Sequence, residues 1–230
     1  MRKVLMVLLL IGLTLSGKVV NSDQLVKKDG VWYEEAENQP FTGLAKGYYS
    51  DGKLRTELTF RDGVPDGPSK GYYVNGKLRS EGNFEKDKKA GVWQHYFENG
   101  AVQIREEYNG DKCVVRDYFE NGNLSMERHI EGGKLNGPLT WYYENGALNG
   151  QCNFTEDVAE GIETRYFEDG KTKKSEYEYV QGNITGKGIE YYPNGKQAVE
   201  AHYVDAKKDG PYKGWFESGQ LAVEIDYKAD

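Results

Sequence analysis

The sequence is poor in the long apolar stretches from which membrane spans and helical bundles are built. No leucine-rich helical stretch follows residue 15, and the one uncharged apolar run, "VLMVLLLIGLTL", covers residues 4–15. A membrane-spanning helix needs about 20 apolar residues, so this run is too short for a comfortable span. With 37% apolar residues, the chain can form a core but is not rich in apolar side chains.

Residues 1–22 have the order of a secretory signal peptide: two basic residues, the apolar run, and a small, polar end. Val20 and Ser22 suit the −3 and −1 positions of a cleavage site after Ser22, and Thr14 and Ser16 form an alternative pair. No cysteine lies nearby, so a lipid-anchored product is not expected. The sequence predicts an exported bacterial protein, in the periplasm, at the cell surface or secreted. An uncleaved N-terminal anchor is the alternative.

Positive charge is also scarce. The chain has 30 lysines and arginines against 37 acidic residues, and its formal net charge is −7. Loss of residues 1–22 removes three basic residues and no acid, which leaves 27 against 37 and a net charge of −10. Such a chain repels phosphate backbones and anionic lipid headgroups. The sequence therefore argues against nucleic-acid binding and, once the leader is removed, against stable membrane insertion.

What the chain does contain is one phrase repeated eight times. "GYYSDGKLRTELTF" (47–60) returns as "GYYVNGKLRSEGNF" (71–84), and a turn glycine, usually preceded by Asn or Asp, recurs every 22 to 25 residues. So regular a period indicates a repeat array. The turn glycines are Gly52, Gly76, Gly100, Gly122, Gly146, Gly170, Gly195 and Gly219.

Aromatic residues and a second glycine occupy fixed positions relative to each turn glycine. An aromatic residue stands three residues before it (−3) and another four before it (−4). A ring or Ile130 stands eight after it (+8), shifted by one to Tyr179 in the longer sixth repeat. The second glycine stands nine before (−9), except that the fourth repeat has Cys113. The −4 column is Tyr48, Tyr72, Tyr96, Tyr118, Tyr142, Tyr166, Tyr191 and Trp215.

Each repeat is predicted to be a β-hairpin. Asn-Gly accepts the positive φ angles of a two-residue type I′ turn, and the flanking runs have strand composition. Looser links, such as residues 61–67 and 85–91, would join the hairpins. With a two-residue turn, the −3 ring faces the +2 residue, usually leucine, and the −9 glycine faces the +8 ring. The −4 rings and a +5 column of glutamates would share the other face, and a longer turn would invert the assignment.

The predicted fold is all-β: tandem antiparallel hairpins form one long, twisted or curved single-layer sheet, a solenoid-like meander over residues 43–230. Residues 23–42 are predicted to be an atypical capping half-repeat whose Trp32 and Phe41 cover the first apolar face. Cys113 and Cys152 fall on strands about 14 Å apart, whereas a disulfide needs Cα atoms within about 7 Å. The sequence therefore predicts two free thiols and no intrachain disulfide.

The pattern G-x4-[YW]-[YF]-x-[ND]-G-x-L-x2-E-x2-[FY] covers about residues 28–227 in eight tandem copies. It resembles the second class of MORN repeats, found in bacterial proteins grouped with the YwqK antitoxin-like family. The opening "PFTG" followed by "YYSDGKL" is similar to those proteins as well. The resemblance implies a hairpin array that acts as a scaffold or binding surface, and it supplies no catalytic residue. The departures from the pattern are Cys113, Thr172, Gln197 and Ser218.

No set of residues indicates a catalytic or metal site. The three histidines diverge, and His129 and His202 would lie about 29 Å apart by sheet spacing. The glutamate column recurs in most copies, which is typical of solvated sheet residues. A convergent acid pair within one repeat would argue for a glycan-acting site, and the sequence shows none. We therefore predict a protein that is not an enzyme and has no cofactor or metal.

The candidate binding site is the −4 column, a stripe of rings about 9.6 Å apart. Such rings suit protein partners, and they can also stack on sugars; alternatively, they only cover a single-layer sheet. The sequence predicts an exported macromolecule-binding scaffold with a protein partner. That partner would be a toxin, with the acidic array suited to a basic one, in an antitoxin or immunity role. The alternatives are a cell-surface interaction or adhesion module with an envelope or surface protein, and a glycan binder.

Overall fold

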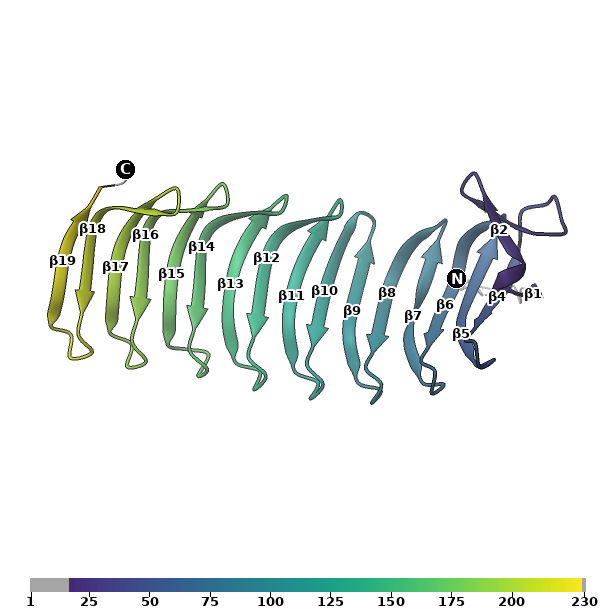
Figure 1. Cartoon of the computed structure of the whole chain (residues 1–230), viewed down its shortest axis with the longest axis horizontal. Coiled ribbons are helices and arrows are strands. Elements are labelled where there is room, and N and C mark those ends of the chain that lie inside the picture. The colour runs from purple at the N-terminus through teal and green to yellow at the C-terminus, as the bar shows by residue number, and fades with distance from the viewer. Residues whose placement is uncertain (1–16, 229–230) are drawn as a thin grey trace, which may run out of the picture.

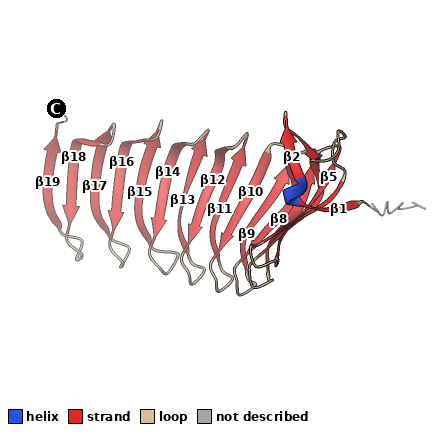
Figure 2. Cartoon of the chain, turned by 45° about the vertical axis from the view of Figure 1, so that its right-hand side comes forward, coloured by secondary structure: helices blue, strands red, loops and turns tan. Residues whose placement is uncertain are grey.

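The computed structural model describes residues 17–228, and most of them lie in one long sheet (Figure 1). The sheet has 17 strands; sixteen follow one another in chain order from β4 to β19, each antiparallel to the next, and β1 is added in parallel beside β4. Figure 2 shows that the ribbon twists along its length, so that strands near its two ends are tilted against each other. The predicted all-β, single-layer meander of hairpins is confirmed.

Each of the eight repeats supplies two strands to this sheet. The first strand ends in every case at the −4 aromatic residue: β4 Gly43–Tyr48, β6 Val64–Tyr72, β8 Lys88–Tyr96, β10 Lys112–Tyr118, β12 Lys134–Tyr142, β14 Val158–Tyr166, β16 Asn183–Tyr191 and β18 Lys207–Trp215. The second strand begins just after the turn: β5 Leu54–Arg61, β7 Leu78–Glu85, β9 Val102–Asn109, β11 Leu124–Glu131, β13 Leu148–Thr155, β15 Lys173–Val180, β17 Gln197–Val204 and β19 Leu221–Tyr227.

The N-terminal segment caps the first repeat. It consists of β1 (Lys18–Asn21), the short 3-10 helix η1 (Ser22–Gln24) and a two-stranded sheet of β2 (Leu25–Lys28) and β3 (Val31–Glu34). The rings of Trp32 and Phe41 both pack edge-on against Phe60, with centroids 6.1 and 5.8 Å away. Both rings thus cover the first repeat as the sequence predicts, and burial of apolar area against Phe60 stabilises the end of the array.

Strand β1 falls inside residues 1–22, the segment predicted to be a leader. Val20 is only 6% exposed and belongs to the same core cluster as Phe41 and Phe60. Lys18 forms ion pairs with Glu34 and Glu37. Residues 17–21 are thus packed and paired as part of the folded domain, while the rest of the predicted leader, residues 1–16, lies outside the described residues.

The predicted type I′ turn at the turn glycines is wrong. In the second repeat, the N–H of Tyr73 donates to the carbonyl of Lys77 (2.8 Å) and the N–H of Gly76 donates to the carbonyl of Tyr73 (2.9 Å). Gly76 has φ +83°, whereas Asn75 is not among the residues with positive φ. The loop is therefore a type I turn closed by a glycine bulge. The Asn75 side chain accepts a hydrogen bond from the N–H of Lys77 (3.0 Å), which holds Asn75 in its turn position.

The two-residue turns lie at the other ends of the strands, in the links predicted to be looser. Asp62 and Gly63 have φ +49° and +77°, and the flanking Arg61 and Val64 pair directly. The other long links also close through two residues, so the strand pairing continues up to the turn at this end of the strands as well. Asp62-Gly63 and Gln181-Gly182 place glycine at the second position, which accepts the left-handed conformation of a type I′ turn. The links at residues 86–87, 156–157 and 205–206 have positive φ at two non-glycine residues, so their turns are set by the pairing of the flanking strands.

The register is right at one end of each hairpin and wrong at the other. Gly67 pairs with Phe84, as predicted for −9 and +8, and six repeats have this glycine–ring pair. The equivalent pair is Cys113 with Ile130 in the fourth repeat and Gly161 with Tyr179 in the sixth. Near the turn, however, Leu78 pairs with the −4 residue Tyr72 and not with Tyr73. A register shift follows directly, between Gly71 and Tyr72. The extra loop residue and this bulge offset each other, and the far pairs keep the predicted register.

Candidate binding surfaces

The sheet has two faces of different chemistry. The tyrosine face carries the −4 rings and the +5 glutamates, and the ring–glycine face carries the +8 rings with the −9 glycines paired to them. The predicted separation of these columns onto opposite faces is confirmed. The −3 rings lie at the hairpin ends instead, and in four repeats their hydroxyls donate to the backbone carbonyl of the next repeat's −4 residue. These donors are Tyr49, Tyr73, Tyr143 and Tyr192.

The predicted aromatic stripe exists on the tyrosine face. Tyr48 is 43% exposed, and the other seven members, Tyr72, Tyr96, Tyr118, Tyr142, Tyr166, Tyr191 and Trp215, are half-buried. Three of the hydroxyls are used within the sheet, since Tyr72 donates to Glu57 and Tyr96 to Glu81 (both 2.8 Å), and Tyr191 donates to Glu176 (2.7 Å). Burial is the largest cause and the hydrogen bond to the carboxylate the next, and together they raise the pKa of each of the three tyrosines to about 12.

Cations from the neighbouring strands also contact the glutamates of this face. Glu57 lies 3.1 Å from the Nζ of Lys46, and Glu127 lies 2.5 Å from the Nε of Arg116. Lys213 and Glu224 form a similar pair at 3.1 Å. The tyrosine face is therefore a half-exposed ladder of cross-strand pairs whose polar groups largely satisfy one another. This makes its acidic character weaker than the glutamate column alone suggests.

The ring–glycine face holds most of the buried side chains of the array. Its buried residues are Ala45, Phe60, Trp93, Cys113, Val115, Cys152 and Ala201. Trp93 shows how the face packs: its ring lies against Phe84 (centroids 4.9 Å apart) and over Gly82, where a Cβ would come within 2.1 Å of the indole. A bare glycine backbone is needed there because the ring occupies the space of a side chain.

An ion-paired cluster on this face went unnoticed in the sequence. The carboxylate of Glu106 accepts a hydrogen bond from Lys89 (2.5 Å) and lies 3.7 Å from His95. Burial alone would raise the pKa of Glu106, but the hydrogen bonds to His95 and Lys89 outweigh it and lower the pKa to about 2. Lys89 and His95 lie on β8 and Glu106 on the adjacent β9, so the pairing register of these two strands brings them together.

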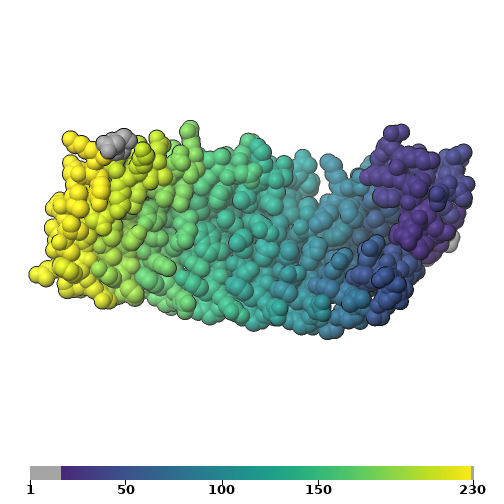
Figure 3. Space-filling view, viewed as in Figure 1, coloured from purple at the N-terminus to yellow at the C-terminus, as the bar shows by residue number. Residues whose placement is uncertain are grey.

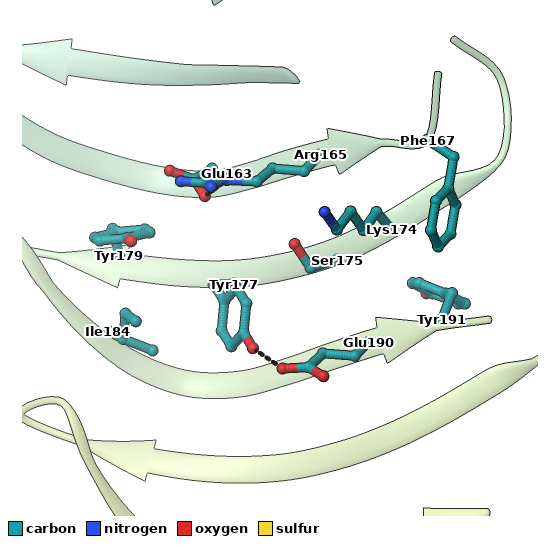
Figure 4. Close-up of a pocket in the computed structure, with 10 residues that line it drawn as sticks. All are labelled: Glu163, Arg165, Phe167, Lys174, Ser175, Tyr177, Tyr179, Ile184, Glu190 and Tyr191. Carbon is teal, nitrogen blue, oxygen red and sulfur yellow. Dashed lines mark hydrogen bonds and ion pairs between the residues drawn. The ribbon is translucent and has the colours of Figure 1, made fainter. Parts of the chain in front are cut away.

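A second feature missed in the sequence is an open hollow of about 520 Å³ over β14, β15 and β16 (Figure 4). Arg165 donates to Glu163 (2.7 Å), and the hydroxyl of Tyr177 donates to Glu190 (2.5 Å). Glu163 and Glu190 belong to successive repeats and are 27 residues apart in the chain. Two glutamates of different repeats thus line one hollow, one on each side of β15 (Figure 4).

The remaining predicted residues are placed as follows. The eight turn glycines all have positive φ, between +66° and +93°, at the hairpin ends. Cys113 lies on β10 and Cys152 on β13, with β11 and β12 between them. Within residues 17–228, no group of three or more His, Cys, Asp or Glu side chains is arranged to hold a metal ion. Over the same residues, no helix is long and apolar enough to cross a membrane.

The space-filling view shows the array as one continuous slab, with the capping segment (residues 17–42) standing at its N-terminal end (Figure 3).

Comparison with known families gives one clear match. The family model described as "MORN repeat variant" matches six segments that together cover more than half of the chain: residues 41–62, 65–86, 89–109, 135–156, 184–205 and 208–229. The fourth and sixth repeats are not matched, which are the repeat with Cys113 in place of glycine and the repeat with an extra residue beside Thr172. Both nevertheless form the same paired hairpin as the others.

The other comparisons are weak. No curated protein sequence matches the chain. A solved structure titled "Crystal Structure of TarM" is similar at 12% identity and a TM-score of 0.29, covering 41% of this chain and 18% of that one. A mutant of S. aureus TarM in complex with Fondaparinux, alpha-GlcNAc-glycerol and UDP is similar at 12% identity and a TM-score of 0.28, covering 47% and 19%. The chain thus spans under a fifth of the length of these proteins, and both TM-scores are too low to indicate a shared fold.

Proposed function

The chain belongs to the MORN repeat variant family, and we propose that it is an exported, non-enzymatic scaffold whose ring–glycine face binds another protein. One observation carries this proposal. The chain's own cap docks on the ring–glycine face of the first repeat, where Trp32 and Phe41 pack against Phe60. The same columns continue through the other seven repeats without a second layer among the described residues.

Beyond the cap, this face offers rings that are half-buried and have no covering element among the described residues. Phe84, Tyr108, Phe154 and Tyr203 are examples, one from each of four repeats. Covering such rings removes apolar area from water, at about 25 cal/mol per Å² before the costs of association. A partner segment that packs as the cap does would gain this free energy. The tyrosine face offers less, because several of its hydroxyls and carboxylates already have partners.

For the partner we propose a basic protein, which the net charge of −7 favours through faster encounter and complementary potential. In the specific version, the protein neutralises a basic toxin by covering its active surface, as an antitoxin or immunity protein. The rival version is an envelope or cell-surface interaction module. Export favours the rival, or an immunity role outside the inner membrane, because a cytoplasmic toxin would be out of reach.

The proposal can be tested by crosslinking from defined positions. A photoreactive phenylalanine would replace Phe154 or Tyr203 on the ring–glycine face, and Tyr118 or Tyr142 on the tyrosine face as matched controls. We expect one protein to be captured in near-stoichiometric amount from the first pair only, in the cells of origin. Capture from the control pair alone would move the binding site to the tyrosine stripe. Capture from neither face would reject the scaffold role.

The identity of the captured protein then separates the two versions. A basic effector from the same cell, whose toxicity the full chain relieves, would support the immunity role. An envelope protein without toxicity would support the surface module and leave the antitoxin version without support.

We also propose that the leader is cut after Ser16 and not after Ser22. A cut after Ser22 would remove all of β1, including the buried Val20 and the ion-paired Lys18. A cut after Ser16 leaves β1 whole, with Gly17 as the first residue. N-terminal sequencing of the exported protein tests this directly. A mature chain that starts at Asp23 would overturn the position of the cut, and retention of Met1 would overturn the leader itself.

A further inference from the structure

The hollow over β14, β15 and β16 interrupts the repeat columns of the ring–glycine face. The position of Glu163 is held by an uncharged residue in each of the other seven repeats, such as Ala45, Ser69 or Val115. The position of Arg165 is held by glycine in three repeats and by His95, Asp117, Trp141 and Glu190 in the other four, so no other repeat has Arg or Lys there. The fold therefore needs neither charge at these places. In a repeat protein, the shared columns form the fold, and a local departure that gathers polar groups in one hollow calls for a different reason.

The lining of the hollow combines ring surfaces with groups that have spare hydrogen-bonding capacity. Arg165 uses its Nε on Glu163 and stacks near the ring of Trp141 (5.8 Å), while its two terminal nitrogens have no hydrogen bond among the described residues. Glu190 accepts the hydroxyl of Tyr177 through Oε1 only. One guanidinium edge and one carboxylate oxygen therefore remain open to a ligand.

Tyr177 is held firmly in this hollow. Its ring packs edge-on against Tyr203, with centroids 6.0 Å apart, and lies over the buried Gly188, where a Cβ would come within 2.7 Å of the ring. The hydrogen bond to Glu190 fixes its hydroxyl. Tyr179, on the same strand, adds a second half-buried ring to the lining. The aromatic groups are thus ordered before any ligand arrives, which lowers the entropic cost of binding.

The charges in the lining are balanced. Glu163 and Glu190 carry two negative charges, and Arg165 and Lys174 carry two positive ones. A charged ligand therefore gains little net attraction, whereas a neutral ligand with many hydroxyls finds both donors and acceptors. The volume of about 520 Å³ lies within the usual range of small-ligand sites.

We propose that this hollow binds a neutral sugar unit of a glycan. In this proposal the C–H face of the sugar lies on the ring of Tyr177, its hydroxyls donate to Glu190 and Glu163, and the terminal nitrogens of Arg165 donate to its oxygens. Figure 4 shows the positions of these four side chains. The site binds and does not hydrolyse in this proposal. The hollow lies on the same ring–glycine face that the proposed protein partner covers, so a partner seated on β14–β16 would compete with the sugar.

The test uses the purified full chain and calorimetric titration with neutral trisaccharides (maltotriose, cellotriose and chitotriose) and with anionic trigalacturonic acid. We expect at least one neutral trisaccharide to bind and trigalacturonic acid to bind more weakly. Glu190→Gln and Tyr177→Leu should each weaken binding by about tenfold or more, which corresponds to about 1.4 kcal/mol. Glu200→Gln is the matched control, because Glu200 lies on the next strand but on the tyrosine face, paired with Lys187 at 2.8 Å.

Three results would overturn the proposal: no binding of any neutral trisaccharide, binding of the anionic one alone, or equal loss in Glu200→Gln. Circular dichroism of each variant separates lost binding from lost fold. Tyr177→Phe keeps the ring and removes the hydroxyl, so it serves as a second, milder variant. Because no partner protein is present in these titrations, their outcome is independent of the crosslinking result.

Discussion

The hydroxyl of Tyr72 donates a 2.8 Å hydrogen bond to the carboxylate of Glu57, fifteen residues earlier and in the preceding repeat. The same relationship joins Tyr96 to Glu81 and Tyr191 to Glu176. Each bond links the −4 ring of one repeat to a glutamate of the repeat before it. Stability in an array depends on such nearest-neighbour contacts between repeats, in addition to the backbone ladder.

These tyrosines predict a loss of stability at alkaline pH. Their folded pKa of about 12 lies above the ordinary value of 10, so the stabilisation is fully present below pH 10 and is lost as the pH rises through 12. Thermal unfolding between pH 8 and about 12 would measure this. The triple variant Tyr72→Phe, Tyr96→Phe, Tyr191→Phe should lose part of that dependence. Tyr48→Phe, at the exposed end of the column, is the control, and an unchanged alkaline decline in the triple variant would contradict the link.

Glu106 predicts the opposite pH dependence. Its folded pKa of about 2 lies below the ordinary 4.5, so the stabilisation is present above pH 4.5 and is lost as the pH falls through 2. Glu106→Gln should cost about 1–3 kcal/mol at neutral pH, since Lys89 and His95 lose their partner in a half-buried place. Urea unfolding at pH 7 and pH 3 measures both effects. A variant that matches the parent protein at pH 7 would show that the cluster contributes nothing.

Because Trp93 packs over Gly82, we expect a smaller side chain at position 93 to reduce the destabilisation caused by a substitution of Gly82. Gly82→Ala should destabilise by about 1–3 kcal/mol, because its Cβ would come within 2.1 Å of the indole. In the background Trp93→Leu, the same change should cost clearly less, since a smaller side chain leaves room. Thermal unfolding of the four proteins of this double-mutant cycle gives the coupling. Additive effects would mean that Gly82 is needed for its backbone conformation and not for the close approach.

Gly76→Ala is a useful comparison, since nothing lies within 4 Å of the position of its Cβ. Any cost there, about 1–3 kcal/mol, comes from the φ of +83° alone. No change at Trp93 should relieve it.

Two adjacent valines test whether β1 is an integral strand. Val20 is 6% exposed and Val19 is 58% exposed. Val20→Asp places a charge in the core beside Phe41 and Phe60 and should lower the melting temperature strongly, while Val19→Asp should leave it nearly unchanged. Equal melting temperatures for the two variants would mean that β1 does not pack as described.

Both cysteines should titrate as free thiols. Burial raises the pKa of Cys113 and Cys152, so a disulfide-exchange reagent should react only slowly with the native protein. After denaturation, the same reagent should titrate two thiols per chain. Mass spectrometry of the non-reduced protein gives an independent count. A 113–152 bridge would be incompatible with their places on β10 and β13, which two other strands separate.

The sequence by itself determined the repeat architecture and the separation of the −4 and +8 columns onto opposite faces, while the −3 rings, predicted on the face of the +8 rings, lie at the hairpin ends. Period, turn glycines and alternation are local properties, and strand pairing between consecutive segments follows from short connections. Thus Gly67 faces Phe84 as predicted, and Trp32 and Phe41 cover the first repeat as predicted. The turn types were interchanged, because Asn-Gly suits a type I′ turn and a type I turn with a glycine bulge equally well, and only the closing hydrogen bonds decide.

The tertiary structure alone decided which distant side chains meet. Glu163 and Glu190, of successive repeats, line one hollow with β15 between them, and Glu106 meets Lys89 and His95 across the β8–β9 pair. A one-residue slip in the register would send each side chain to the other face, so the sequence pattern does not reveal these clusters. The same holds for β1, whose sequence resembles the end of a leader while in the structure it is an edge strand that pairs with β4 and buries Val20.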